Sequence, residues 1–201
     1  MHIMTIFGKY TRRTYILLMC VFFISCTTDP PMIPKPMAYP RIEKAVSESL
    51  VEYSSTRFSF RHTQNAKIDQ LDTPEPEQVW LNILYPDYNA TIHCSYIPIR
   101  SGNLREIAED NHRLLYSHAM QANFMEEHAL ERHQQSVYAS VFVLDGNIAT
   151  PIQFFLTDSI SGFFRGSLYY DNKVNFDSVA PLTEYLKEDI FTLIKSFRWK
   201  K

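Results

Sequence analysis

The stretch VWLNILYPDYNATIHCSYIPI, residues 79–99, decides the fold because it has the pattern of two strands joined by a tight turn. Residues 79–85 are rich in apolar and aromatic side chains that favour strands, and Pro86 ends that run. In residues 90–99, alternation places Ile92, Cys94 and Tyr96 on one face and Thr91, His93 and Ser95 on the other. The stretch therefore predicts a hairpin in which Cys94 is a small core residue.

Further strands and two helices are expected around this hairpin. Alternating apolar residues predict strands at 58–60, 137–144, 151–156 and 163–170, and helical periodicity predicts helices at 104–125 and 178–199. Asp177 or Ser178 would cap the second helix. Residues 41–54 fit a short helix or irregular chain, and the polar segment 62–78 reads as a loop.

The order of the main elements is strand–strand–helix–strand–strand–strand–helix. Strands that follow one another through short turns imply an antiparallel β-sheet, and the apolar stripes of the helices must then pack on it. The expected fold class is α+β, an antiparallel β-sheet with packed helices in a layered sandwich. This element order resembles that of the Mog1/PsbP-like families, a resemblance of order that carries no function.

The N-terminus has the pattern of an export signal. A basic segment precedes an apolar run at 14–24, which as a helix would rise only about 16 Å at roughly 1.5 Å per residue. A bilayer core is about 30 Å thick, so the run fits the apolar region of a signal peptide better than a permanent span. Residues 23–26, FISC, resemble the lipobox of bacterial lipoproteins, in which a small residue precedes an acylated cysteine. We therefore expect lipidation at Cys26; an ordinary signal peptide with an unrelated cysteine is the alternative.

These features divide the chain into three parts. Residues 1–25 are expected to be the lipoprotein signal peptide, 26–40 a proline-rich tether, and 41–201 a single α+β periplasmic domain. The prolines of the tether favour an extended chain and exclude a continuous helix. They are Pro30, Pro31, Pro34, Pro36 and Pro40.

Charge and cysteine content limit the possible partners and cofactors. The formal net charge is −2, and removing the basic signal makes the body more acidic, which argues against a nucleic-acid partner. Of the three cysteines, Cys20 leaves with the signal and Cys26 would be acylated. Cys94 alone then remains, which excludes an intrachain disulfide and a zinc site built from cysteines. No cofactor is expected.

Motifs for enzymatic chemistry are missing from the sequence. HExxH, GxSxG, GxGxxG and the P-loop pattern do not occur. His118 falls beside an apolar helical stripe, where a half-buried structural histidine is the simpler interpretation. A polar cluster near the expected helix end has the pattern of a solvated face; it comprises Glu127, His128, Glu131 and His133. The sequence therefore predicts no enzyme, and a hydrolase built on His118 or on the loop at 157–166 remains a minor alternative.

The loop TDSISGFFRG, residues 157–166, is the most unusual surface feature. Asp158, Ser159 and Arg165 form a candidate interaction loop, because functional loops are commonly held between rigid strands. A plain hairpin closed by an aspartate turn is the simpler alternative. Ser159 and Ser178 each follow an aspartate and precede an apolar residue, a pattern of bacterial O-glycosylation. Intact-mass measurement of the native protein should then show added glycan, and an unmodified mass would remove this hypothesis.

Several stretches together resemble the gliding motility-associated lipoprotein GldD family of the Bacteroidetes. They are IPKPMAYPRI (33–42), VWLNILYPDYNATIHCSYIPI (79–99), LLYSHAMQA (114–122) and the long stretch from GNIATPIQFF to LIKSFRW (146–199). Ala38 stands where the family has Gly, and Cys94 where it has an apolar residue such as Leu.

The resemblance implies a non-enzymatic accessory or stabilising subunit of the gliding motility and type IX secretion machinery. Its partners would be the membrane, through the lipid anchor, and other envelope proteins. No acidic cluster follows Cys26, unlike in surface-exported lipoproteins of that phylum, so we expect anchorage to the outer membrane facing the periplasm. The alternative function is a periplasmic ligand- or glycan-binding module with a pocket lined by Trp80, Tyr169 and Tyr170.

Overall fold

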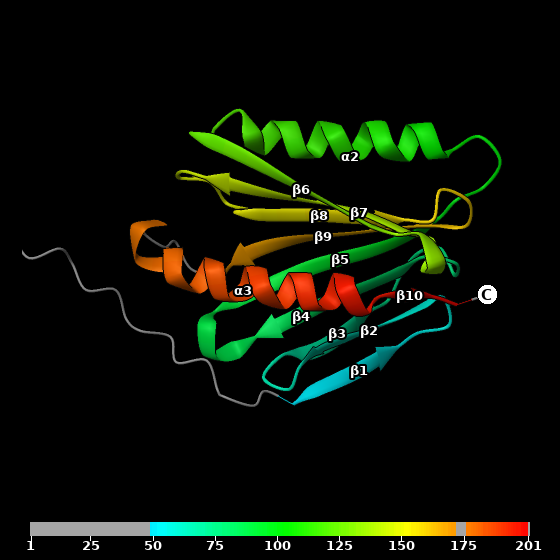
Figure 1. Ribbon diagram of the computed structural model, residues 1–201, viewed down its shortest axis with the longest axis horizontal. Coiled ribbons are helices and arrows are strands. Elements are labelled where there is room, and N and C mark those ends of the chain that lie inside the picture. The colour runs from blue at the N-terminus through cyan, green and yellow to red at the C-terminus, as the bar shows by residue number, and fades with distance from the viewer. Residues whose placement is uncertain (1–48, 172–175, 201) are drawn as a thin grey trace, which may run out of the picture. The chain divides into compact units, whose positions relative to one another are not determined.

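The computed structural model describes residues 49–171 and 176–200, which belong to one compact unit of the chain. Figure 1 shows the strands, the two long helices and the short 3₁₀ helices η1 and η2. In chain order they are β1 (Leu50–Ser54), β2 (Phe58–Thr63), β3 (Lys67–Leu71), β4 (Val79–Tyr85), η1 (Pro86–Tyr88), β5 (Ala90–Pro98), α2 (Leu104–Ala119), β6 (Phe124–Arg132), η2 (His133–Gln135), β7 (Val137–Asp145), β8 (Ile152–Thr157), β9 (Gly162–Tyr170), α3 (Phe176–Ser196) and β10 (Arg198–Trp199).

A seven-stranded sheet forms the middle of this unit, with strand order β3-β4-β5-β9-β8-β7-β6. Every neighbouring pair in it is antiparallel. A small sheet of order β1-β2-β10 packs with α3 on one face of the large sheet, and α2 lies over the other face (Figure 1). The fold is therefore α+β with an antiparallel sheet between helical layers, as the sequence predicts.

The main core lies between the large sheet and the layer of α3 and the small sheet. Its aromatic centre joins Phe58 of β2 to Phe164 of β9 and to Phe197, which follows α3, with ring centroids 4.9 and 5.4 Å from that of Phe58. All three side chains are fully buried. Because aromatic rings bury large areas, this cluster holds the two sheets and the C-terminal segment together.

Gly166 allows the sheet to pack closely at the centre of β9. A Cβ atom at this position would lie 2.6 Å from Cε1 of the buried Phe154 ring, closer than real Cβ atoms approach. Glycine therefore lets the Phe154 ring pack directly on the β9 backbone. Its neighbours Arg165 and Ser167 point to the opposite face of the sheet, since side chains alternate along a strand.

A smaller apolar cluster fixes α2 on its face of the sheet. Leu115, the buried residue of this helix, packs with Phe142 and Leu144 of β7 and with Ile148. Ala119, one turn further along, packs against the same cluster as a partly buried side chain. α2 is therefore held to the sheet mainly through Leu115 and Ala119.

The strands expected at 58–60, 79–85, 90–99, 137–144, 151–156 and 163–170 are all present, with small changes at their ends. The expectation of a loop at 62–78 was wrong, because β2 continues to Thr63 and residues 67–71 form β3. β3 is an edge strand, and four of its five residues are exposed, so it lacks the apolar alternation of an inner strand.

Three helix expectations also need correction. Residues 50–54 form β1 rather than a helix, while residues 41–48 lie outside the described part. The helix expected at 104–125 ends at Ala119, and the polar cluster that includes Glu127 and His128 lies on the edge strand β6. α3 begins at Phe176, so Asp177 and Ser178 lie inside the helix and not at its cap. It ends at Ser196, because Arg198 and Trp199 pair with β2 as β10.

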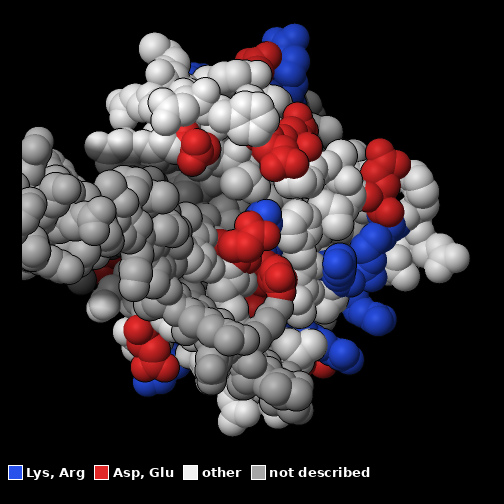
Figure 2. Space-filling model, turned by 60° about the vertical axis from the view of Figure 1, so that its left-hand side comes forward, with Lys and Arg blue, Asp and Glu red and all other residues white. Residues whose placement is uncertain are grey.

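Two further observations concern membranes and charge. Among the described residues, no helix has the length and apolar character required to cross a bilayer. On the face that Figure 2 shows, acidic side chains are spread over the middle, and basic ones gather toward one side. The described residues visible on this face do not form the continuous basic surface typical of nucleic-acid-binding proteins.

Candidate functional site

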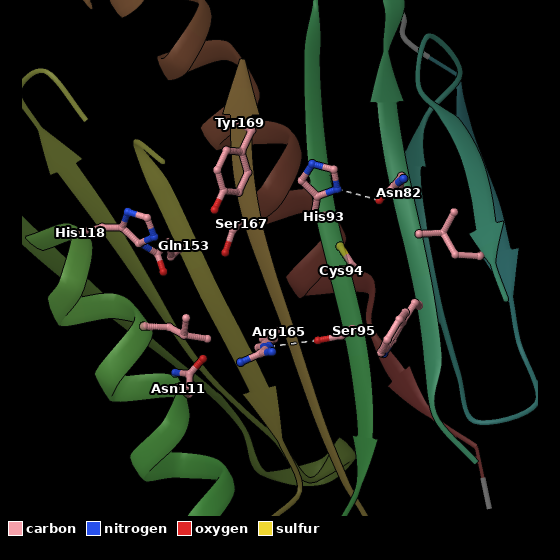
Figure 3. A pocket seen from close by; sticks show the side chains of 13 residues that line it. Asn82, His93, Cys94, Ser95, Asn111, His118, Gln153, Arg165, Ser167 and Tyr169 are labelled. Carbon is pink, nitrogen blue, oxygen red and sulfur yellow. Dashed lines mark hydrogen bonds between the residues drawn. The ribbon is translucent and has the colours of Figure 1, made fainter. Parts of the chain in front are cut away.

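A pocket of about 490 Å³ lies between α2 and the sheet face that α2 covers (Figure 3). Strands β3, β4, β5, β9 and β8 supply its floor and walls, and α2 supplies its roof. The lining side chains are Leu71, Trp80, Asn82, His93, Cys94, Ser95, Asn111, Leu114, His118, Gln153, Arg165, Ser167 and Tyr169. Most of them are polar, which distinguishes this face of the sheet from the apolar core face.

Strand register explains why these residues meet. One row across the sheet runs Leu71, Trp80, Ser95 and Arg165, each directly opposite the next on β3, β4, β5 and β9. The adjacent row runs Asn82, His93, Ser167 and Gln153 on β4, β5, β9 and β8. Because side chains two positions apart point to the same face, both rows project toward α2.

The roof comes from one side of α2. Asn111, Leu114 and His118 are spaced by three and four residues, so they lie on the same face of the helix. Asn111 and His118 are half-buried, while Leu114 keeps 47% of its surface exposed. His118, which the sequence places beside the apolar stripe of this helix, thus points into the pocket together with Asn111.

Hydrogen bonds hold several polar side chains of the floor in place. Nε of Arg165 donates to Oγ of Ser95 at 3.0 Å, and Nδ1 of His93 lies 2.8 Å from Oδ1 of Asn82. The His93 ring also packs edge-on against Tyr169, with 5.3 Å between the ring centroids. The floor is therefore an ordered polar surface.

Arg165 places a positive charge in this pocket. Burial lowers the pKa of its guanidinium, and the carboxylate of Asp110 partly opposes that effect. Asp110 itself pairs with Arg113 at 2.8 Å. Among the side chains that the structure describes, those of 49–171 and 179–200, none forms an ion pair with Arg165. A guanidinium remains protonated in proteins, so within this part of the chain the pocket contains a half-buried cation without a countercharge in contact.

The structure separates the three residues of the candidate interaction loop. Arg165 lies within β9, on the pocket face, whereas Asp158 and Ser159 lie on the turn before that strand. The carboxylate of Asp158 accepts hydrogen bonds from the backbone N–H groups of Ile160, Ser161 and Gly162 at 2.9, 2.7 and 3.0 Å. The aspartate turn offered as the simpler interpretation is therefore present.

Asp158 is also bound by the hydroxyl of Ser161. Partial burial acts to raise the pKa of Asp158, but the hydrogen bonds from Ser161 and from the backbone N–H groups outweigh it and lower that pKa. The carboxylate thus closes the turn. Ser159 is exposed and adopts a left-handed backbone with φ of 64°. The turn borders a second open cavity of about 880 Å³, to which Tyr96 and Trp199 also contribute.

Two of the three aromatic residues expected to line a ligand pocket do so. Trp80 and Tyr169 line the pocket under α2, but Tyr170 points to the other face, where its hydroxyl lies 2.6 Å from Oγ1 of Thr183 in α3. Alternation along β9 separates Tyr169 from Tyr170, a signal already present in the sequence. The polar row of Asn82 and His93 could have been found in the same way from the hairpin pattern.

The sequence also singles out His118, Cys94, Cys26 and Ser178. The ring of His118 has no hydrogen-bond partner among the residues described, and the described chain brings no three metal-ligating side chains together. Cys94 lies on the core face of β5 and is buried, and this burial raises the pKa of its thiol. Cys26 lies outside the described residues, as does the side chain of Ser178.

Comparison with known proteins supports the resemblance. The family model for the gliding motility lipoprotein GldD matches residues 29–199. No curated protein matches the chain at a significant level. Among solved structures, the solution structure of cyanobacterial PsbP from Synechocystis is 15% identical over 80% of this chain and 98% of that chain, with a TM-score of 0.44. Because the family model covers most of the sequence, the chain belongs to the gliding motility lipoprotein GldD family.

Proposed function

We propose that the protein is a non-enzymatic accessory or stabilising subunit of the gliding motility and type IX secretion machinery. In this proposal Cys26 is acylated, the lipid anchors the chain to the outer membrane, and the domain at 41–201 faces the periplasm. The observation that carries the proposal is the match to a gliding motility lipoprotein family over residues 29–199, which begins just after the lipobox. A proline-rich tether between the lipid anchor and the domain would allow the domain to reach other envelope proteins.

Purification of the full-length chain from solubilised membranes tests this role. The chain carries a C-terminal tag in its native cells, and co-purified proteins are identified by mass spectrometry. We expect envelope proteins of the gliding and secretion machinery to be enriched over a control, an unrelated tagged lipoprotein of the same membrane. Recovery of the same proteins with both baits would contradict the proposed subunit role.

A second function, binding of a small periplasmic ligand, is favoured by the pocket under α2. Its volume of about 490 Å³ falls within the roughly 300–1,000 Å³ typical of ligand sites. Trp80 and Tyr169 offer aromatic surface, and the hydrogen-bonded Asn82 and His93 offer fixed polar groups. Both functions fit one protein, because the pocket and the anchor use different parts of the chain.

A further inference from the structure

We propose that the pocket under α2 binds a small organic carboxylate, with Arg165 as the residue that pairs with its charged group. This inference rests on the second proposed function, ligand binding, and adds the chemical class of the ligand. Figure 3 shows the Arg165 side chain on the pocket floor, with Ser95 beside it and Asn111 of α2 nearby.

Arg165 carries a charge that no described side chain balances by contact. Removing a cation from water is costly unless an anion or several acceptors replace the water. The guanidinium has one hydrogen bond, from Nε to Ser95, and neither Nη atom bonds to another described residue. Asp110, whose carboxylate acts electrostatically on Arg165, is paired with Arg113. A ligand carboxylate would supply the missing countercharge, and its two oxygens match the fork of a guanidinium.

The charge of the pocket favours a single carboxylate over a phosphate. Among the described residues, Arg165 is the one Lys or Arg whose side chain lines this pocket, so it balances one negative charge. Phosphate sites commonly add further cations or a helix N-terminus. Here Asn111 and Leu114 lie near the middle of α2 and His118 in its last turn, so the N-terminus of this helix does not face the pocket. A monoanion placed at Arg165 therefore fits this lining better than a dianion.

Apolar side chains in the pocket suit the uncharged body of the ligand. Leu71, Trp80 and Leu114 line the pocket with 39%, 37% and 47% of their surfaces exposed. Trp80 lies in the same row as Arg165, with Ser95 between them. Two strand spacings separate β4 from β9, roughly 10 Å. A ligand whose carboxylate pairs with Arg165 can thus cover Trp80 with an apolar or aromatic group, if that group lies roughly 10 Å from the carboxylate.

Side chains of β5, the strand between Trp80 and Arg165, would recognise polar groups in the middle of the ligand. Ser95 and His93 of this strand both line the pocket. Amides and hydroxyls both donate and accept hydrogen bonds. The pocket therefore suits a ligand that combines a carboxylate, a central amide or hydroxyl, and an apolar end.

Matched pairs of charged and neutral probes test the proposal on the full-length acylated protein in nanodiscs. The first pair is N-acetyl-L-phenylalanine and N-acetyl-L-phenylalaninamide; the second is hexanoate and hexanamide, and phenyl phosphate tests the phosphate alternative. Dissociation constants come from calorimetric titration. We expect the carboxylate of at least one pair to bind ~10-fold or more tightly than its amide, since a hydrogen bond to a charged group is worth roughly that ratio.

The variant Arg165→Gln should abolish this preference while leaving weak binding of the amides. Arg61→Gln is the matched control, because Arg61 is exposed on β2 and does not line the pocket. Circular dichroism and thermal unfolding verify that both variants fold. If Arg165→Gln does not fold, the wild-type comparison of carboxylate with amide still decides the question.

Three results would overturn the proposal: no carboxylate binds at its highest soluble concentration, carboxylate and amide bind equally, or phenyl phosphate alone binds. A preference that survives in a folded Arg165→Gln would remove the assigned role of Arg165. Failure of this inference is distinguishable from failure of the subunit role, because the membrane purification with the Arg165→Gln chain measures partner recovery separately.

Discussion

Replacing Phe58 with alanine is expected to lower the free energy of unfolding by about 3–5 kcal/mol. The ring is fully buried, and its centroid lies 5.7 Å from that of Tyr96 in β5 and 4.9 Å from that of Phe164 in β9. It also stacks on Phe197 at 5.4 Å. Truncation therefore leaves a cavity where β2, the large sheet and the C-terminal segment meet.

Such a loss is a large part of the roughly 5–15 kcal/mol that stabilises a typical domain. Urea unfolding of wild type, Phe58→Ala and Phe124→Ala measures it, with the change in midpoint multiplied by a shared slope. Phe124 is the control, because 64% of its surface is exposed and its truncation should change stability by less than about 0.5 kcal/mol. Equal midpoints for the two variants would contradict the assignment of Phe58 to the centre of the core.

Replacing Cys26 with alanine is expected to abolish fatty-acid incorporation and to release the protein from the membrane fraction. The reason is that Cys26 ends the lipobox-like pattern FISC at 23–26, where the acyl chains of a bacterial lipoprotein would be attached. Cells grown with a labelled fatty acid provide the measurement, by label in the purified protein and by its distribution between membrane and soluble fractions.

Cys94→Ala is the control for this experiment. Cys94 is buried in β5, and burial raises the pKa of its thiol, so it offers no accessible nucleophile for acylation. The Cys94→Ala chain should carry as much label as wild type. Equal labelling of wild type and Cys26→Ala would show that the lipid is attached elsewhere or is absent.

The sequence predicts the inner strands well because each buries one face. Burial alternates residue by residue along β4 and from Ile92 to Ile97 in β5, and that alternation is the signal from which the hairpin at 79–99 was expected. The edge strands are different. β3 and β6 pair on one side only and carry charged residues along their length, which blunts an edge but removes the apolar pattern. Both were therefore missed.

The end of α2 was placed too late for a related reason. Met120, Ala122 and Met125 continue the apolar spacing of the helix, and nothing local in that stretch forbids another turn. The chain turns back at this point because β6 pairs with β7 from Phe124 onward, with Phe124 opposite Asp145. Pairing between distant segments overrides a helical pattern that is only moderately strong.

The pocket could be predicted in part. Local alternation is enough to place Asn82 with Trp80 and His93 with Ser95 on shared faces. It does not reveal that Arg165 lies opposite Ser95, because that pairing depends on the register of β5 with β9, strands separated by α2 and three other strands. Arg165 was consequently grouped with Asp158, its neighbour in sequence, and not with the residues that surround it in space.

A strain that lacks the gene tests the proposed role of the protein, which is to serve the gliding and secretion machinery from a membrane anchor. The strain is complemented by wild type, by Cys26→Ala or by an empty vector. Gliding speed, secreted protein and the abundance of envelope lipoproteins are measured together. We expect gliding and secretion to fail without the gene, to return with wild type and not to return with Cys26→Ala. Normal gliding, secretion and lipoprotein levels in the strain with the empty vector would contradict it.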